Sequence, residues 1–238
     1  MKKITVAVDS FKGSLSSQEV AEAVARGVHR VLPQCEVRCV SIADGGEGTV
    51  EALVHTLCGE VVEVEVADPL MRRIVARYGV VDGGTTAVME MAAASGLPLL
   101  SVEERNPLKT TTYGTGEMIA DALGRGCRKI LMGIGGSATN DAGVGMMQAL
   151  GYRFLDAAGL ELSGGGEILS RIAAIDDSGV MPQLREAEIT VACDVTNPLY
   201  GEQGAAYVYA PQKGATYLDK KQAKEQALLE AGVLTEDF

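Results

Sequence analysis

The segment ILMGIGGSATNDAGVGMMQAL, residues 130–150, sets the pattern around which the rest of the chain is arranged. Residues 130–134 form a short apolar run that predicts a buried strand. The run stops at Gly135 and Gly136, where a backbone free to adopt positive φ can turn sharply. The segment therefore predicts a strand that ends in a tight glycine turn.

A hydroxyl-rich and acidic stretch follows this turn and contains Ser137, Thr139, Asn140 and Asp141. Apolar residues then recur every third position over 144–150, which predicts a helix with Asn140 or Asp141 as its N-cap. Loops that join a strand to a helix bind anions, because unpaired N–H groups point at the ligand and glycines allow close approach. We therefore treat this loop as a candidate phosphate site, with an ordinary glycine-rich turn as the alternative. It is neither a Walker A loop nor a GxGxxG motif.

Composition and charge argue against several binding partners and indicate where the protein is located. The chain has 238 residues, a formal net charge of -11 and a pI near 4.7, which argues against nucleic-acid or anionic-membrane binding. No apolar run approaches the length of a membrane span and the first residues do not resemble a signal peptide, so we expect a cytoplasmic protein. Five cysteines without a CxxC pair and only two histidines argue against a zinc cluster.

The beginning of the chain alternates predicted strands and helices. Strands are expected over 3–8 and 36–42, each followed by a helical pattern, and this βαβα order indicates a parallel sheet with crossover helices. Ligands of such sheets collect outside the carboxyl ends of the strands. Asp9 with Lys12, and Asp44, follow the two strands and are therefore candidate site residues.

The pattern changes from Glu60 onward. Strands are predicted over 60–66, 74–81 and 86–91, and the short turns between them indicate antiparallel pairing and a second domain with a boundary near residues 68–69. Glu90 falls at the end of the third strand. It is either a carboxylate facing a cleft or a capping carboxylate at the surface.

A second hydroxyl-rich loop covers residues 110–117 and leads into a helix predicted over 118–123. Threonines at a helix start usually serve only as caps. Two hydroxyl-rich loops that both lead into helices are nevertheless harder to dismiss as caps alone.

Six blocks of the sequence, in one order, resemble the bacterial type 1 glycerate kinases. The blocks are DSFK at 9–12, ADGGEGT at 43–49, EMAAASGL at 90–97, GIGGSATND at 133–141, CD with NPL at 193–199, and PQKGA at 211–215. The resemblance runs in register from residue 4 to about 216. Two small departures are Val8, where the family usually has proline, and Ala142, where glycine is common; neither removes a functional group.

The resemblance implies a flavodoxin-like (Rossmann-like) α/β domain with a second α/β domain inserted into it, and an active site between them. Residues 1–66 would form the first part of the flavodoxin-like domain and 67–216 the inserted domain with the glycine loop. The segment 217–238 departs from the family: its residues 217–234 have a charged amphipathic pattern that predicts a C-terminal helix, and the chain end follows. Family members continue well beyond this point, so we expect the first domain to be incomplete. Exposed apolar edges near Val6 and Val40 would then favour a homodimer through that side, or poor solubility.

The resemblance also implies ATP-dependent phosphorylation of D-glycerate, a small-molecule substrate, to 2-phosphoglycerate. Such chemistry needs positioned phosphates, Mg²⁺ on carboxylates and a cation near the developing charge. Residues of suitable type are Asp9, Lys12, Asp44 and Asp194 for catalysis, Ser10 and Arg105 for glycerate, Gly135, Gly136, Ser137, Thr139 and Lys213 for ATP phosphates, and Asp141 and Asp194 for Mg²⁺.

Several of these roles stay open between two residues. Either Asp9 or Asp44 would take the proton of the alcohol. Either Lys12 or Lys213 would neutralise phosphate or the glycerate carboxylate, and Arg105 is a second candidate for that carboxylate because its planar fork pairs with two oxygens. For each acid the alternative is an aspartate that only stabilises a turn or a helix start.

Two other functions remain open on the sequence alone. One is a kinase of the GHMP type, the class of galactokinase and mevalonate kinase, which residues 135–139 resemble locally. The other is a noncatalytic remnant or ligand-binding module that lacks the family's C-terminal part. A kinase site requires Asp9, Asp44 and Asp194 to face one cavity beside the glycine loop. For the 238-residue chain alone we expect weak or no turnover.

Overall fold

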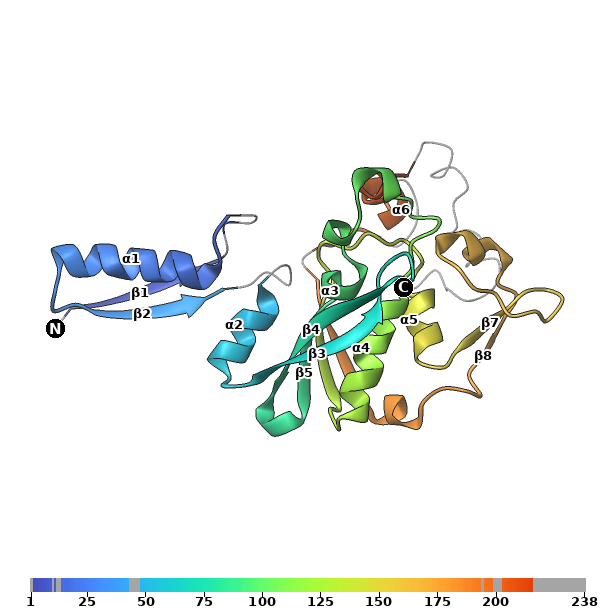
Figure 1. The fold of residues 1–238 in the computed structure, drawn as a ribbon, viewed down its shortest axis with the longest axis horizontal. Coiled ribbons are helices and arrows are strands. Elements are labelled where there is room, and N and C mark those ends of the chain that lie inside the picture. The colour runs from blue at the N-terminus through green and yellow to red at the C-terminus, as the bar shows by residue number, and fades with distance from the viewer. Residues whose placement is uncertain are drawn as a thin grey trace.

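The computed structural model describes residues 2–9, 11, 14–42, 48–193, 195–198 and 203–215. Figure 1 shows a small strand–helix–strand unit at one end of the molecule and a larger α/β body at the other. In the described part of the chain, no helix is long and apolar enough to cross a membrane. The predicted α/β class is confirmed.

The small unit consists of β1 (Lys3–Val8), α1 (Ser17–Val31) and β2 (Glu36–Ser41). The two strands are parallel neighbours in a two-stranded sheet, as predicted, with Ile4 opposite Val37. Helix α1 begins with a capping box: Glu19 N–H donates to Ser16 Oγ at 3.2 Å, and Ser16 N–H donates to Glu19 Oε2 at 2.8 Å. This reciprocal pair satisfies two donors that a helix start otherwise leaves open.

The larger body contains a five-stranded sheet in the order β3-β4-β5-β6-β9. Its strands are β3 (Glu60–Ala67), β4 (Arg73–Val81), β5 (Thr86–Glu90), β6 (Lys129–Gly133) and β9 (Glu188–Ala192). The first three strands pair antiparallel, as predicted, and β5, β6 and β9 pair parallel. We expected the strand over 130–134, as part of the inserted domain, to lie in a separate sheet from the strands over 3–8 and 36–42. Strand β6 does lie in a different sheet from β1 and β2.

The remaining elements are short. A second two-stranded sheet pairs β7 (Arg153–Leu155) antiparallel with β8 (Ala174–Asp176). The other α-helices are α2 (Thr49–Thr56), α3 (Ala92–Ser95), α4 (Tyr113–Gly124), α5 (Val144–Ala149) and α6 (Ala205–Val208). The 3₁₀ turns are η1 (Asp82–Gly84), η2 (Leu97–Leu99), η3 (Val102–Glu104), η4 (Gly166–Arg171), η5 (Pro182–Glu186) and η6 (Ala210–Lys213).

Strand β3 belongs to the larger sheet. It pairs with β4 from Glu60 opposite Val80 to Ala67 opposite Arg73, because the turn over 68–72 is too short to separate the two strands. Residues 60–66 therefore lie in the five-stranded sheet, and the change of sheet falls between β2 and β3. The division into folding domains at 66 and 216 stays a prediction, and the helix predicted over 217–238 lies outside the described residues.

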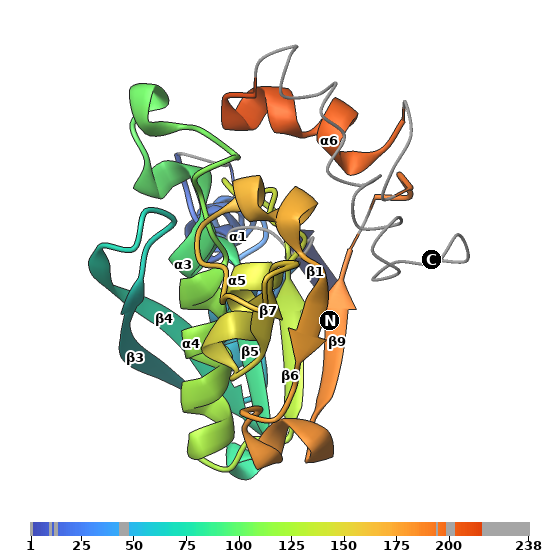
Figure 2. The ribbon, with the colours of Figure 1, turned by 90° about the vertical axis from the view of Figure 1, so that its right-hand side faces the viewer.

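The five-stranded sheet is covered on both faces, because side chains alternate along each strand. On one face, α4 buries Met118 and Ile119 against Tyr78, Met89 and Ile130. Figure 2 shows α4 lying against the sheet, with α5 beside it. On the other face, Val50 of α2 packs with Val81 and Val88. The edge strand β9 is less well covered, with Ile189 and Val191 40% and 49% exposed.

We expect the small unit to mediate dimerisation or to lower solubility. Parallel strands are normally buried on both faces, and a two-stranded parallel sheet leaves both strands as edges. Light scattering at increasing protein concentration should show a dimer. Val40→Lys in β2 should shift it toward monomer, whereas Val191→Lys in β9 should not. A monodisperse monomer with a cooperative thermal melt comparable to that of a full domain would contradict this expectation.

Candidate functional site

The glycine loop over residues 135–141 lies between β6 and α5, and its backbone is held at several points. Gly136 has φ of 72°, as the predicted turn requires, and its carbonyl accepts a hydrogen bond from Leu97 N–H at 2.9 Å. Ala138 N–H donates to the carbonyl of Ser95 at 2.8 Å. These bonds fasten the loop to the end of α3, while Gly135 and Gly136 stay exposed.

The hydroxyl groups of the loop bond to one another. Ser137 Oγ and Thr139 Oγ1 lie 2.8 Å apart, and Thr139 N–H donates to Ser137 Oγ at 3.1 Å. Among the described residues, the N–H groups of Gly135 and Gly136 have no hydrogen-bond acceptor. The structure therefore presents two exposed glycine N–H groups next to two hydroxyls, which is suitable for an anion.

Asp141 is the buried anchor of this loop. It is 1% exposed, and its Oδ2 accepts hydrogen bonds from Thr112 N–H at 2.8 Å, Thr112 Oγ1 at 2.9 Å and Gly145 N–H at 3.2 Å. Thr111 Oγ1 also donates to Oδ2 at 3.4 Å, and Gly143 N–H donates to Oδ1 at 3.2 Å. The carboxylate thus ties the start of α4 to the start of α5.

The predicted N-cap is wrong, because α5 begins at Val144 and its N-cap is Gly143. Positive φ values of 51° at Ala142 and 73° at Gly143 turn the chain tightly after Asp141. This turn brings the Asp141 carboxylate to N–H groups of the first helical turn without placing Asn140 or Asp141 at the cap position. The two threonine donors lie about thirty positions upstream in the hydroxyl-rich loop over residues 110–117, and the sequence did not indicate that they bond Asp141.

The described residues do not fit a magnesium site. Asp141 is 1% exposed and its Oδ2 already accepts four hydrogen bonds from the protein, whereas Mg²⁺ needs an octahedral shell of oxygen ligands that usually includes several waters. Within the described ranges, no three His, Cys, Asp or Glu residues are grouped so that they could hold a metal ion. Asp194, the other residue predicted for Mg²⁺, lies outside the described residues.

Lys213 contacts the glycine loop although it lies 74 residues after Thr139 in the chain. It ends the η6 turn, and its Nζ donates to the carbonyl of Thr139 at 2.6 Å. Burial lowers the pKa of Lys213 to about 8, against a smaller opposing effect of the Asp141 charge. The lowered pKa means that burying this ammonium destabilises the fold below pH 8, and that this cost is relieved as pH rises from 8 toward 10.5. At neutral pH the lysine is still charged.

Arg105 lies against the same turn. A Cβ atom on Gly214, whose φ is 91°, would lie 2.1 Å from the Arg105 carbonyl oxygen, so the two backbones are in direct contact. The Nε atom of Arg105 is buried and has no hydrogen-bond partner among the described residues. The structure therefore brings the Arg105 segment, Lys213 and the glycine loop together.

The other predicted site residues are placed only in part. Asp9 follows β1 at its carboxyl end and is partly buried. Ser10, Lys12, Asp44 and Asp194 lie outside the described residues. The convergence of the three aspartates on one cavity therefore stays a prediction.

Glu90 is a capping carboxylate. Its Oε1 accepts a hydrogen bond from Val50 N–H at 3.0 Å, in the first turn of α2. Burial raises the pKa of Glu90, although backbone N–H groups of Val50, Thr49 and Gly48 act in the opposite direction. Of the two alternatives from the sequence, the structure supports a cap, but one that is partly buried and not at the surface.

We expect Asp141→Asn to lower the free energy of unfolding by about 2–3 kcal/mol, because an amide nitrogen would face backbone donors in a buried site. Asp156→Asn is the matched control: Asp156 also accepts two loop N–H groups, from Ala158 and Leu160, but is partly exposed. It should cost about 1 kcal/mol or less. Urea unfolding of both variants tests this, and equal losses would contradict the anchoring role of Asp141.

Comparison with known proteins gives one consistent result. The chain matches the model of the glycerate kinase family over residues 4–237. It is 54% identical over 214 residues to the glycerate kinase of Bacillus subtilis (strain 168), covering 90% of this chain and 56% of that protein. It is 50% identical over 214 residues to the glycerate 2-kinase of Escherichia coli (strain K12), again covering 90% of this chain and 56% of the relative.

A solved structure agrees with these matches. The crystal structure of a protein from Salmonella typhimurium LT2, described as a candidate glycerate kinase 2, superimposes with a TM-score of 0.88 at 49% identity. The match covers 96% of this chain and 61% of that one. The chain thus spans between 56% and 61% of the length of these three relatives. With a family match that runs through almost its whole length, the chain belongs to the glycerate kinase family.

Proposed function

We propose that this chain is the part of an ATP-dependent D-glycerate kinase that holds the phosphates of ATP and the carboxylate of glycerate, with 2-phosphoglycerate as the product. The observation that carries the proposal is the meeting of Lys213 and the Arg105 segment at the glycine loop. These cationic residues come from distant parts of a strongly acidic chain, and their meeting beside the hydroxyl-rich glycine loop favours an anionic ligand.

The roles of the residues follow from their chemistry. Phosphoryl transfer depends mainly on positioning and on stabilising negative charge. Gly135 and Gly136 would donate backbone N–H groups to a phosphate, Ser137 and Thr139 would add hydroxyl donors, and Lys213 would supply positive charge beside the loop.

Arg105 would bind the carboxylate of glycerate. Its buried Nε lacks an acceptor among the described residues, and the guanidinium fork matches two carboxylate oxygens. Ser10 is proposed beside it as a second substrate contact. Asp9 and Asp44 stay alternative acceptors for the proton of the alcohol, and Lys12 stays an alternative cation.

Mg²⁺ stays part of the proposal without a described site. Phosphoryl transfer enzymes use it to neutralise charge on the phosphates. Because the Asp141 oxygens are engaged with protein donors, Asp194 is the preferred candidate ligand. We assign no step of the reaction to the ion.

A ligand-binding module without turnover is the second candidate. This candidate concerns the 238 residues given, which span little more than half the length of the glycerate kinase relatives. The GHMP alternative rested on the loop only, whereas the glycerate kinase match covers residues 4–237.

We also propose a cytoplasmic location and a homodimer. The five unpaired cysteines suit a reducing compartment.

A chimera tests the kinase proposal directly. We expect the chain to phosphorylate D-glycerate when it is completed with the C-terminal part of the Bacillus subtilis relative, and to do so weakly or not at all by itself. In the chimera, Asp194→Asn should reduce turnover by about a hundredfold while leaving the thermal melt unchanged, because Asp194 would be a ligand of the ion that neutralises the phosphates. Phosphorus NMR of the product reports both results. Unchanged turnover in the Asp194→Asn chimera would exclude the role of Asp194.

The titration of Lys213 gives a second test. Because its pKa is about 8, the ammonium loses its proton at a pH where the phosphates of ADP are already ionised. We expect the dissociation constant for ADP to rise about tenfold between pH 7.5 and pH 9.5. Lys213→Met should weaken binding at pH 7.5 and remove the pH dependence. Lys129→Met, at the opposite end of β6, is the control and should behave as the unaltered chain; calorimetry that shows pH-independent ADP binding would contradict the role of Lys213.

A further inference from the structure

The turn between β3 and β4, residues 68–72, is rigidly built. Asp68 is 2% exposed, and its Oδ1 accepts hydrogen bonds from Leu70 N–H at 2.8 Å and Arg72 N–H at 2.9 Å. Asp68 N–H donates to the carbonyl of Arg72 at 2.7 Å, and Met71 adopts φ of 66°. A buried carboxylate thus fixes the backbone from which the Arg72 side chain projects.

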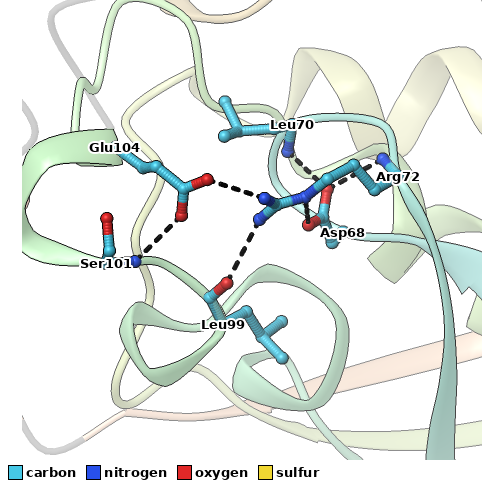
Figure 3. A network of polar contacts seen from close by, with 6 residues as sticks. All are labelled: Asp68, Leu70, Arg72, Leu99, Ser101 and Glu104. Atoms are coloured by element: carbon cyan, nitrogen blue, oxygen red, sulfur yellow. Dashed lines mark hydrogen bonds and ion pairs between the residues drawn. The ribbon is translucent and has the colours of Figure 1, made fainter.

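The Arg72 guanidinium joins this turn to the segment that ends in η3 (Figure 3). Its Nε donates to Asp68 Oδ2 at 2.5 Å, its Nη1 to Glu104 Oε1 at 2.7 Å, and its Nη2 to the carbonyl of Leu99 at 3.3 Å. The second oxygen of Glu104 accepts a hydrogen bond from Ser101 N–H at 2.9 Å. One planar fork therefore holds three acceptors from two segments that are about thirty residues apart.

The same turn contacts the segment that anchors the glycine loop. The carbonyl of Pro69 accepts a hydrogen bond from Thr111 N–H at 3.0 Å. Thr111 and Thr112 donate to the Asp141 carboxylate. The turn thus lies between the Arg105 segment on one side and the support of the loop on the other.

Arg105 follows Glu104 directly in the chain. Its side chain has many rotamers, so the direction of its guanidinium depends on a fixed backbone at residues 104 and 105. We infer that Arg72 is a positioning residue for Arg105: by holding Glu104 and Leu99, it fixes the backbone from which Arg105 reaches the carboxylate of the substrate. This inference rests on the proposed function of Arg105.

An ion pair at the surface is the simpler explanation, and the structure offers a comparison. Arg72 is 49% exposed and Glu104 35%, and exposed pairs usually contribute little. Arg77 and Glu63, on the same hairpin, form such a pair with both side chains more than half exposed, and Arg77 has no further acceptor among the residues that the structure describes. Arg72 differs because it also bonds a buried carboxylate and a backbone carbonyl, so its removal leaves buried Asp68 without a side-chain partner.

Four single variants of the 238-residue chain and one double variant separate these explanations: Arg72→Gln, Arg72→Lys, Arg105→Gln, the control Arg77→Gln, and Arg72→Gln combined with Arg105→Gln. Calorimetry measures the dissociation constants for D-glycerate and ADP, and hydrogen exchange measures the protection of backbone amides over 97–105. We expect Arg72→Gln to weaken D-glycerate binding about tenfold and ADP binding less than twofold. Arg72→Lys should also weaken D-glycerate binding, because a point charge cannot hold three acceptors.

The double variant provides the decisive readout. If Arg72 acts through Arg105, Arg72→Gln should cause no further loss of D-glycerate affinity in the Arg105→Gln background. Equal factors in both backgrounds, or unchanged D-glycerate affinity in Arg72→Gln, would overturn the inference. The control Arg77→Gln should leave both constants and the exchange unchanged.

Hydrogen exchange keeps the inference separate from the proposed function. If the unaltered chain binds neither ADP nor D-glycerate, the proposed function of the chain fails, and the role of Arg72 is decided by exchange alone. Faster exchange over 97–105 in Arg72→Gln, but not in Arg77→Gln, supports the positioning role. Unchanged exchange in Arg72→Gln overturns it.

Discussion

The arrangement around the glycine loop depends on one buried carboxylate, that of Asp141. A buried charge is strongly destabilising unless hydrogen-bond donors surround it, and here those donors come from the starts of two helices. The need to bring these donors close to the carboxylate also restricts which residue can occupy position 145. A Cβ on Gly145 would lie 2.0 Å from Thr111 Oγ1 and 3.0 Å from Asp141 Oδ2. Glycine is therefore needed at 145 for close approach. The same donors that make Asp141 a good anchor make it a poor metal ligand.

The residues around this anchor are held mainly through backbone contacts. Lys213 bonds a backbone carbonyl of the loop, and Gly214 touches the backbone of Arg105. Short turns at the carboxyl ends of parallel strands can carry polar groups in this way because the sheet behind them is packed on both faces. The fold thus supplies a packed edge, to which Lys213 and the Arg105 segment are attached.

Local patterns predicted the strands well, because β-branched runs and short turns are local properties of the chain. The glycine turn and the antiparallel hairpins were predicted for the same reason. Contacts between distant residues were not predictable: Asp141 bonds threonines about thirty positions away, and Arg72 reaches Glu104 over a separation of 32 residues. In neither pair do the two residues belong to one helix or one strand, so no local pattern relates them. The N-cap of α5 was mispredicted because an aspartate near a helix start bonds the same N–H groups from more than one position.

Glu90 connects the strand that leads into the glycine loop with the start of α2. It pairs in register with Gly133, two residues before the glycine turn, and its carboxylate bonds Val50 N–H in the first turn of α2. Helix α2 (Thr49–Thr56) therefore starts against the end of β5. Burial raises the pKa of Glu90, while the N–H groups at the helix start favour its charged form. Through this one carboxylate, the strand end that lies beside the glycine loop also fixes where α2 begins.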